Sequence, residues 1–278
     1  MNSNIITLIT DMGNKDYYVA SIKGKIYSLL SSVNVVDISH EIKPFDIAHA
    51  SYVLRNCFDE FPIGSVHIVG VNPESTDDIH HCIIKFKGHY FIGADNGFFS
   101  LLCGIELPDK IVRINSDQEI HNLSFPTKNI FVAAAVALIS GTPMENLGEL
   151  SETIIRKQLF RPTAEENVIK GTVSYIDAYG NIITNITKEL FDEICKGRTF
   201  SIYLTRAGYT ITKIHNKYNE VPQGEKVALF SSTGTLEISI NKGVEGSGGG
   251  ANKLFGIKLN DTITIEFNDL KQTNALEL

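Results

Sequence analysis

Several features that would set this chain apart from ordinary globular enzymes are missing from its sequence. No segment approaches the roughly 20 consecutive apolar residues needed to span a bilayer. Residues 1–4 lack the basic start and the apolar core of a signal peptide. Positive charge is in deficit, because the formal net charge is −7, which argues against nucleic acid or an anionic membrane surface as the main partner. These absences leave a small molecule as the expected partner.

Closely spaced cysteines are missing as well. Cys57, Cys82, Cys103 and Cys195 are scattered along the chain, without the pairing that would indicate a zinc site or a redox motif. Three of the four stand in apolar stretches, which favours reduced, buried thiols. We therefore expect no metal site and a cytoplasmic protein.

What is present is a globular composition with room for two domains, since 43% of the 278 residues are hydrophobic and 21% are charged. Residues 1–160 alternate strand-like and helix-like segments, which predicts an α/β domain with a mostly parallel sheet. The expected strands are 5–10, 33–38, 65–71, 82–86 and 90–92, the last two forming a hairpin around Lys87-Gly88. The expected helices are 17–30, 47–58, the short 93–102 and 130–139. The β-branched run 33–38 is expected to be a buried strand, and Asp46 is expected to cap the helix that follows.

From about residue 165 the pattern changes to many short strands, which predicts a smaller, all-β, barrel-like domain over 165–278. The expected strands are 168–176, 181–186, 199–204, 209–213, 226–231, 235–240 and 262–267, with one helix at 187–195. The glycine-rich stretch 243–250 lacks the Lys-Ser/Thr pair and the strand–helix context of a P-loop. It is expected to be a mobile loop.

The first strand ends on Asp11-Met12-Gly13 and leads almost directly into a helix. The carboxyl edge of a sheet is where α/β proteins bind their ligands, and an ionised carboxylate offers two acceptor oxygens to a vicinal diol such as a ribose. Gly13 permits a sharp turn and a close approach of the backbone. The alternative is that Asp11 only caps the helix at 17–30.

Two further segments carry polar side chains at strand ends. In SYIDAYGNIITNI (174–186), Asp177 and Asn181 project from a bend, with Asn185 beyond it; a plain hairpin is the simpler interpretation. A carboxylate can hold an ammonium, and an amide can pair with the edge of a heterocycle. In LFSSTGTLEISI (229–240), Ser231 and Ser232 precede a turn, where their hydroxyls suit a carboxylate or an amino-acid head group.

Taken together, seven segments in order along the chain resemble the S-adenosyl-L-methionine (SAM) hydroxide adenosyltransferases, which share their fold with the fluorinases and chlorinases. They are TDMGNKDYYVASIKG (10–24), VVDISHEIKPFDI (35–47), FPIGSVHIVGVNP (61–73), ADNGFFSLL (94–102), SFPTKNIFVAAAVAL (124–138), DAYGNIITNI (177–186) and SSTGTLEIS (231–239). A Rossmann methyltransferase is not indicated, because no GxGxxG turn follows the first strand.

The resemblance implies a homotrimer that binds SAM, with no separate cofactor, between the first domain of one subunit and the second domain of its neighbour. By similarity, Asp11 would hold the ribose hydroxyls, and Phe45 would stack near the adenosyl or methionyl part. Asp177 would take the methionine ammonium, Asn181 the adenine edge and Ser232 the methionine carboxylate. The alternative for Phe45 is packing in the core.

The reaction that the resemblance implies is displacement at the ribose C5′ with methionine as the leaving group. Hydrolytic members of the family carry an Asp–Arg–His set that handles the attacking water, and this sequence departs from it at all three places. Asn72 stands for the Asp, Ile79 for the Arg and Pro126 for the His. An amide cannot serve as a general base. The neighbouring His80 and His81 are candidates to compensate.

Halogenating members of the family use small hydroxyl groups instead, and Ser75 and Thr127 fall where those would lie, although plain loop polarity also explains both. Asn72, Ser75 and Thr127 are therefore the candidate catalytic positions. Three functions stay open: transfer of the adenosyl group to water, giving adenosine and methionine; binding of SAM or adenosine without catalysis; and adenosyl transfer to a halide or another small anion.

Overall fold

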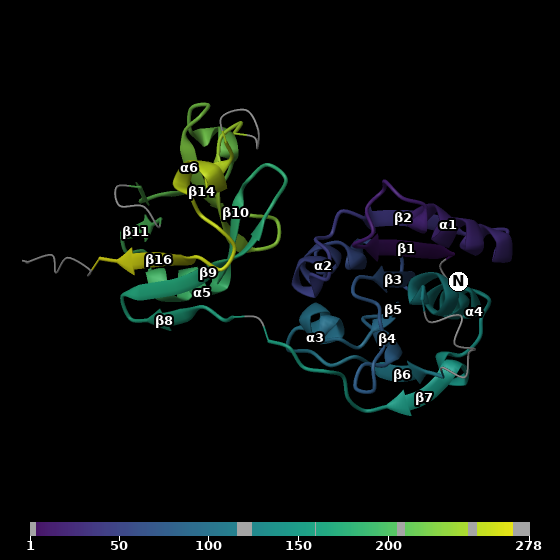
Figure 1. Cartoon of the computed structure of the whole chain (residues 1–278). Helices are drawn as coiled ribbons and strands as arrows, with labels where there is room; N and C mark the ends of the chain where they lie inside the picture. The colour runs from purple at the N-terminus through teal and green to yellow at the C-terminus, as the bar shows by residue number, and fades with distance from the viewer. Residues whose placement is uncertain (1–3, 116–123, 159, 205–208, 244–248, 269–278) are drawn as a thin grey trace, which may run out of the picture. The chain divides into compact units, whose positions relative to one another are not determined.

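The chain forms two compact units, residues 1–159 and 160–278 (Figure 1). The structure, a computed structural model, describes residues 4–115, 124–158, 160–204, 209–243 and 249–268. Each unit has a hydrophobic core of its own.

The first unit is built on a seven-stranded sheet, which confirms the predicted α/β class. In sheet order the strands are β2 (Asn34–Ser39), β1 (Ile5–Thr10), β3 (Val66–Gly70), β5 (His89–Ala94), β4 (His81–Phe86), β6 (Lys110–Ile114) and β7 (Gly148–Ser151). The first four are parallel, and β4, β6 and β7 continue the sheet in antiparallel pairs. The parallel strands therefore end together at one edge, where ligands bind in such sheets.

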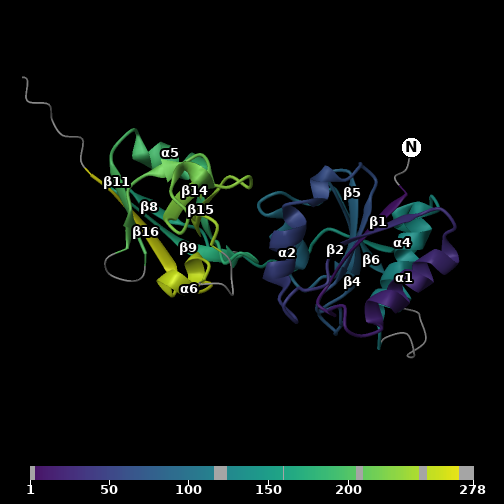
Figure 2. The same ribbon diagram turned by 90° about the horizontal axis from the view of Figure 1, so that it is seen from above.

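Helices cover both faces of this sheet (Figure 2). On one face lie α1 (Tyr18–Leu29), a π-helical turn (Thr127–Phe131) and α4 (Val132–Ile139), packed on the β1 side chains Ile6 and Leu8. On the other lie α2 (Ile47–Arg55), the 3-10 turn Phe58–Glu60 and α3 (Phe98–Cys103), packed on Ile9. The 3-10 turn Met144–Leu147 precedes β7. Alternate side chains of β1 face opposite cores, as expected for a strand buried on both sides.

The predicted boundaries near α2 hold in part. Asp46 caps this helix as expected, because its Oδ1 accepts the His49 N–H at 3.0 Å. The helix ends at Arg55, three residues before the predicted end. The prediction that 33–38 is a buried strand is wrong. β2 is the outermost strand of the sheet and pairs only with β1, so its side chains are half-buried or exposed.

The second unit confirms the predicted all-β, barrel-like fold. Its strand order is β12 (Thr210–Ile211), β11 (Phe200–Tyr203), β16 (Thr262–Phe267), β9 (Val168–Ile176), β10 (Ile182–Thr187), β15 (Thr235–Ile240), β14 (Lys226–Phe230) and β13 (Ile214–His215), with β8 (Thr163–Glu165) paired to β9. The sheet nearly closes, because β12 lies close to β14. Its interior is filled by aliphatic and aromatic side chains.

Three short helical segments complete this unit. The expected helix is α5 (Lys188–Cys195), capped by Thr187, whose Oγ1 accepts the Leu190 N–H at 3.2 Å. The helix α6 (Ala251–Phe255), the 3-10 turn Tyr218–Glu220, β8 and β13 were not predicted. The mobile loop expected at 243–250 lies largely outside the described residues.

A pair of buried histidines joins three strands of the first unit. His67 on β3 is fully buried, stacks on the Phe91 ring, and has its Nδ1 2.7 Å from the Thr7 hydroxyl and its Nε2 3.2 Å from His89 Nδ1. Burial, with the neighbouring His89 adding to it, lowers the pKa of His67 from 6.5 to about 3. His67 is therefore neutral in the folded protein at pH 7.

We expect this histidine to make the first unit sensitive to acid. Unfolded chains bind a proton at His67 below about pH 6.5, whereas the folded chain does not until about pH 3. As the pH is lowered through that interval, the free energy of unfolding therefore falls by about 1.4 kcal/mol for each pH unit. Denaturant unfolding at a series of pH values measures this slope. His67→Phe should flatten it, whereas the exposed His80→Gln should not, and equal slopes in all three proteins would contradict the assignment.

Candidate active site

Asp11 ties together the loops that follow three strands. It lies directly after β1, and its Oδ2 accepts the Phe45 N–H at 2.8 Å and the Asn72 N–H at 3.4 Å. The alternative that Asp11 caps the next helix is wrong, because α1 begins after Tyr17 without any side-chain cap. Its Oδ1 has no protein partner among the described residues, so one carboxylate oxygen is left for a ligand.

Both residues that donate to Asp11 have left-handed backbones. The φ angle is 65° at Phe45 and 45° at Asn72, a region that side chains other than glycine adopt at a cost and mostly at functional sites. The Phe45 ring is 72% exposed, so the interpretation of this residue as core packing is wrong. An exposed ring on a constrained backbone is available to stack on a ligand.

The turn that carries Asp11 is fixed by His40. The carbonyl of His40 accepts the Gly13 N–H at 2.8 Å, and its Nδ1 lies 2.8 Å from the Thr10 hydroxyl. The His40 ring is buried, and its Nε2 lies 3.0 Å from Asp37 Oδ1 on β2. Gly13 itself has a φ of 65°, which suits glycine. The Asp11 carboxylate is therefore held in place before any ligand arrives.

Thr127 brings an unpaired hydroxyl to the same edge. It begins the π-helical turn, is fully buried, and its Oγ1 has no hydrogen-bond partner among the described residues. It packs on the end of β3 so closely that a Cβ at Gly70 would lie 2.8 Å from its Cγ2 and 3.1 Å from Thr10 Cγ2. A buried hydroxyl left unpaired costs about 1–3 kcal/mol, and π-helical turns often occur at functional sites. Ser75, the other hydroxyl candidate, is exposed in the loop after β3.

His81 stands beside the turn that carries Asn72. Its ring is buried edge-on against Phe131, at 5.0 Å between ring centres, and its Nε2 lies 2.9 Å from the Pro73 carbonyl oxygen. A carbonyl only accepts, so Nε2 carries the proton and Nδ1 keeps its lone pair. Burial lowers the pKa of His81, against the opposing effect of the Pro73 hydrogen bond. His80, by contrast, is exposed.

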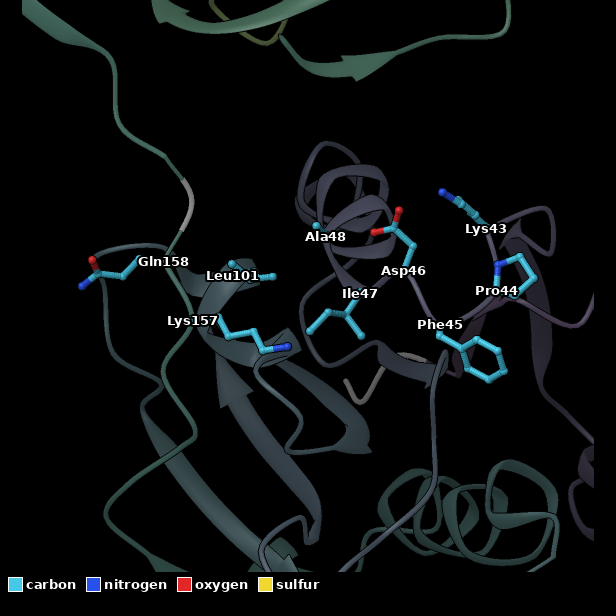
Figure 3. A pocket seen from close by; sticks show the side chains of 9 residues that line it. All are labelled: Lys43, Pro44, Phe45, Asp46, Ile47, Ala48, Leu101, Lys157 and Gln158. Atoms are coloured by element: carbon cyan, nitrogen blue, oxygen red, sulfur yellow. The ribbon is translucent and has the colours of Figure 1, made fainter. Parts of the chain in front are cut away.

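A hollow of about 450 Å³ opens next to Phe45 (Figure 3). Its lining residues are Lys43, Pro44, Phe45, Asp46, Ile47, Ala48, Leu101, Lys157 and Gln158. They come from the loop before α2 and its first two residues, from α3 and from the segment after β7. Nothing in the sequence around Lys157 marked it as part of a site, because it reaches the hollow only through folding.

In the second unit, the structure brings Asp177 and Asn181 together. Asp177 Oδ1 accepts the backbone N–H groups of Tyr179 and Asn181, both at 2.9 Å, and its Oδ2 accepts the Asn181 side-chain amide at 2.9 Å. A ligand ammonium at Asp177 would therefore share the carboxylate with Asn181. Asn185 is structural, since its Oδ1 accepts the Thr172 N–H and its Nδ2 donates to the Phe160 carbonyl.

Ser232 is not brought next to that pair. It lies exposed in the turn between β14 and β15, where the hydroxyls of Ser231 and Thr233 bond to each other at 2.7 Å. This turn lies at the Thr187 end of β10, because Thr187 pairs with Thr235, whereas Asp177 and Asn181 precede the other end of that strand. One ligand would have to extend along β10 to contact both.

The described residues offer neither a metal site nor a membrane span. No cluster of three or more histidine, cysteine or acidic side chains that could hold a metal ion occurs in the part of the chain that the structure describes. Within those residues, no helix combines the length and the apolar character needed to cross a bilayer.

Comparison with known proteins matches both units. Residues 6–148 match the model of the SAM hydroxide adenosyltransferase N-terminal domain, and residues 171–264 match that of the C-terminal domain. An (R)-S-adenosyl-L-methionine hydrolase of Methanocaldococcus jannaschii is 33% identical over 252 residues, covering 85% of this chain and 88% of the relative. A fluorinase of Nocardia brasiliensis is 22% identical, covering 85% and 90%.

Solved structures agree with the fold. The crystal structure of an uncharacterized conserved protein from Thermotoga maritima superposes with a TM-score of 0.83 at 27% identity, covering 94% of this chain and 99% of the other. A conserved hypothetical protein from Thermus thermophilus gives a TM-score of 0.71 at 25% identity, covering 96% and 100%.

Proposed function

The chain belongs to the SAM hydroxide adenosyltransferase family, and from this premise we propose that it hydrolyses SAM to adenosine and L-methionine. The observation in the structure that best supports this is the Asp11 carboxylate. It is fixed at the carboxyl edge by two backbone donors and keeps one oxygen free. That arrangement suits a ribose diol, which the reaction must hold still. SAM is the substrate, and no separate cofactor takes part.

The chemistry asks little of the protein beyond positioning. A water oxygen forms a bond to C5′ as the C5′–S bond breaks, and the sulfur takes the electron pair and leaves as neutral methionine. The sulfonium supplies the activation, so an in-line water and a sheltered site provide much of the remaining rate. We assign the ribose to Asp11 and stacking on the substrate to the exposed ring of Phe45.

We assign the binding of the attacking water to the polar groups around Asn72. The buried, unpaired hydroxyl of Thr127 is a hydrogen-bond partner for the attacking oxygen, with Asn72 and Ser75 as further polar groups of the same loop. None of these three accepts a proton at neutral pH. His81 is neutral and keeps a lone pair on Nδ1, and we assign it the proton that water loses. This assignment replaces the missing Asp–Arg–His set with a histidine on another strand.

The remaining contacts fall in the second unit. Asp177 is assigned to the methionine ammonium and Asn181 to the adenine edge. The methionine carboxylate is on the same carbon as the ammonium, whereas Ser232 lies at the opposite end of β10 from Asp177, so the carboxylate is not assigned to Ser232. Because the ribose and methionine contacts lie in different units of the chain, we expect a homotrimer in which neighbouring subunits complete each site. All four cysteines are free thiols, which fits a cytoplasmic enzyme.

Product analysis tests the hydrolysis directly. Purified protein is incubated with each sulfonium epimer of SAM, and adenosine and methionine are quantified by chromatography, with and without added chloride. Release of both products in equal amounts supports hydrolysis, whereas a 5′-halogenated adenosine would indicate halide transfer instead. Tight SAM binding without any product would favour a binding protein and overturn the proposal.

The oligomeric state is a separate expectation. Light scattering at micromolar concentration should give a mass close to three chains, and mixing a variant disabled in Asp11 with one disabled in Asp177 should restore some activity through mixed trimers. A monomer that turns over SAM at full rate would contradict shared sites.

A further inference from the structure

The hollow beside Phe45 is lined by two lysines, Lys43 and Lys157, but has no assigned ligand group. We propose that Lys157 binds the carboxylate of the substrate's methionyl group there and so makes the enzyme select SAM over analogues without that carboxylate. The inference rests on the proposed function, because it assumes that SAM occupies the edge held by Asp11. Phe45 connects the two places, since its N–H bonds to Asp11 Oδ2 while its side chain lines the hollow.

The position of Lys157 is fixed by its neighbours in the first unit. Its N–H donates to the Ser100 hydroxyl at 2.8 Å, and that hydroxyl lies 3.3 Å from the Lys157 carbonyl. Its aliphatic stem lies on Gly97, where a Cβ would come within 2.7 Å of the Lys157 Cγ and Cδ atoms. Gly97 has a φ of 100°. A side chain there would be disfavoured both by this backbone conformation and by the clash with the Lys157 stem.

The segment on which the Lys157 stem lies, Asn96-Gly97, is hydrogen-bonded to the turn that carries Asn72. Asn96, the residue before Gly97, donates from its side-chain amide to the Asn72 carbonyl at 2.9 Å. In Figure 3 the Lys157 side chain extends toward Ile47, whereas that of Gln158 turns the opposite way. The ammonium is therefore directed into the hollow from a backbone anchored to the candidate site.

The chemistry of the lining matches a methionyl group. Phe45, Ile47 and Leu101 offer apolar contact to a thioether chain. Lys157 has no ion-pair partner among the described residues, whereas the nearby Asp46 uses one oxygen to cap α2. The carboxylate is the only anionic group of SAM. A single contact with Lys157 would therefore account for a preference for SAM over an analogue without the carboxylate.

A comparison of three ligands tests this assignment. Dissociation constants are measured by calorimetry for SAM, for its decarboxylated analogue S-adenosylmethioninamine and for adenosine. The proteins are the wild type, Lys157→Met, Lys157→Arg and Gln158→Met. Gln158 is the matched control, because it lines the same hollow next in sequence but points away.

We expect the wild type to prefer SAM over the decarboxylated analogue by roughly tenfold, the size of one charge-assisted contact that is partly screened by water. Lys157→Met should lose that preference while keeping its affinity for adenosine, which also shows that the variant is folded. Lys157→Arg and Gln158→Met should keep most of it. Added salt should weaken the preference in the proteins that keep a cation at residue 157, the wild type, Lys157→Arg and Gln158→Met.

The three ligands distinguish a failure of the Lys157 assignment from a failure of the proposed function. Undiminished preference for SAM in Lys157→Met would overturn the role of Lys157 and leave the hydrolysis standing. Failure of the wild type to bind SAM or adenosine would instead overturn the proposed function itself.

Discussion

Replacing His81 with phenylalanine should lower kcat for adenosine release by about 10²-fold or more, because a positioned general base contributes roughly 10²–10⁴-fold to a rate. The affinity for SAM should change little, since His81 donates to the Pro73 carbonyl and is not assigned to the substrate's binding contacts. Phenylalanine keeps the edge-on packing against Phe131. Initial rates at saturating SAM, with binding measured separately, give the comparison.

The pH profile separates a base from a structural residue. His81 works as a base only when it is neutral, and burial lowers its pKa, so the wild-type rate should fall only below about pH 6.5. That acid limb should be absent from the residual activity of His81→Phe. The titratable group whose charge acts on His81 is His80, the residue directly before β4.

The exposed neighbour provides the control for this prediction. His80→Phe should retain the wild-type rate and the same acid limb. Equal rates and profiles for His81→Phe and the wild type would show that the proton is accepted elsewhere, with water itself as the remaining acceptor.

Replacing Asp11 with alanine should weaken SAM binding by about 10²-fold. The change removes the charge-assisted hydrogen bonds assigned to the ribose diol, and it also leaves the N–H groups of Phe45 and Asn72 without their partner. Calorimetry with SAM and with adenosine should show the same loss for both ligands, because both carry the diol. A 2′,3′-dideoxy analogue, which lacks the diol, should lose much less affinity than SAM on going from the wild type to the variant.

A second acidic residue near the same turn serves as the matched control. Asp16 is exposed and is assigned no ligand contact, so Asp16→Ala should bind SAM as the wild type does. Full SAM affinity in Asp11→Ala would mean that the ribose is held by other groups, and the carboxyl edge of β1 would lose its assigned role.

Local patterns in the sequence predicted much of the first unit correctly, since their causes are local. The cap at Asp46 follows from a side chain that bonds three residues ahead. The hairpin between β4 and β5 follows from Lys87 and Gly88, whose φ angles of 50° and 80° suit its two-residue turn. The burial of β2 was mispredicted because a β-branched run does not reveal whether a strand has neighbours on one side or on both.

The candidate site was less accessible to such reasoning because its contacts are long-range. The choice between a cap and a ligand-binding carboxylate at Asp11 depends on partners 34 and 61 residues away. The exposure of Phe45 depends on its left-handed backbone. The local sequence Lys-Pro-Phe-Asp (43–46) does not predict that conformation. Lys157 enters the hollow through contacts with Gly97 and Ser100, about 60 residues earlier in the chain.

The left-handed backbone at Asn72 has an evolutionary consequence. Asparagine and aspartate are the side chains that tolerate this conformation best after glycine, so exchange of one for the other alters the chemistry of the loop without altering its path. An aspartate at residue 72 would therefore add a carboxylate to this loop without moving the edge that carries Asp11. The geometry at residue 72 restricts which amino acids selection can try there, and it makes this exchange a short step in either direction.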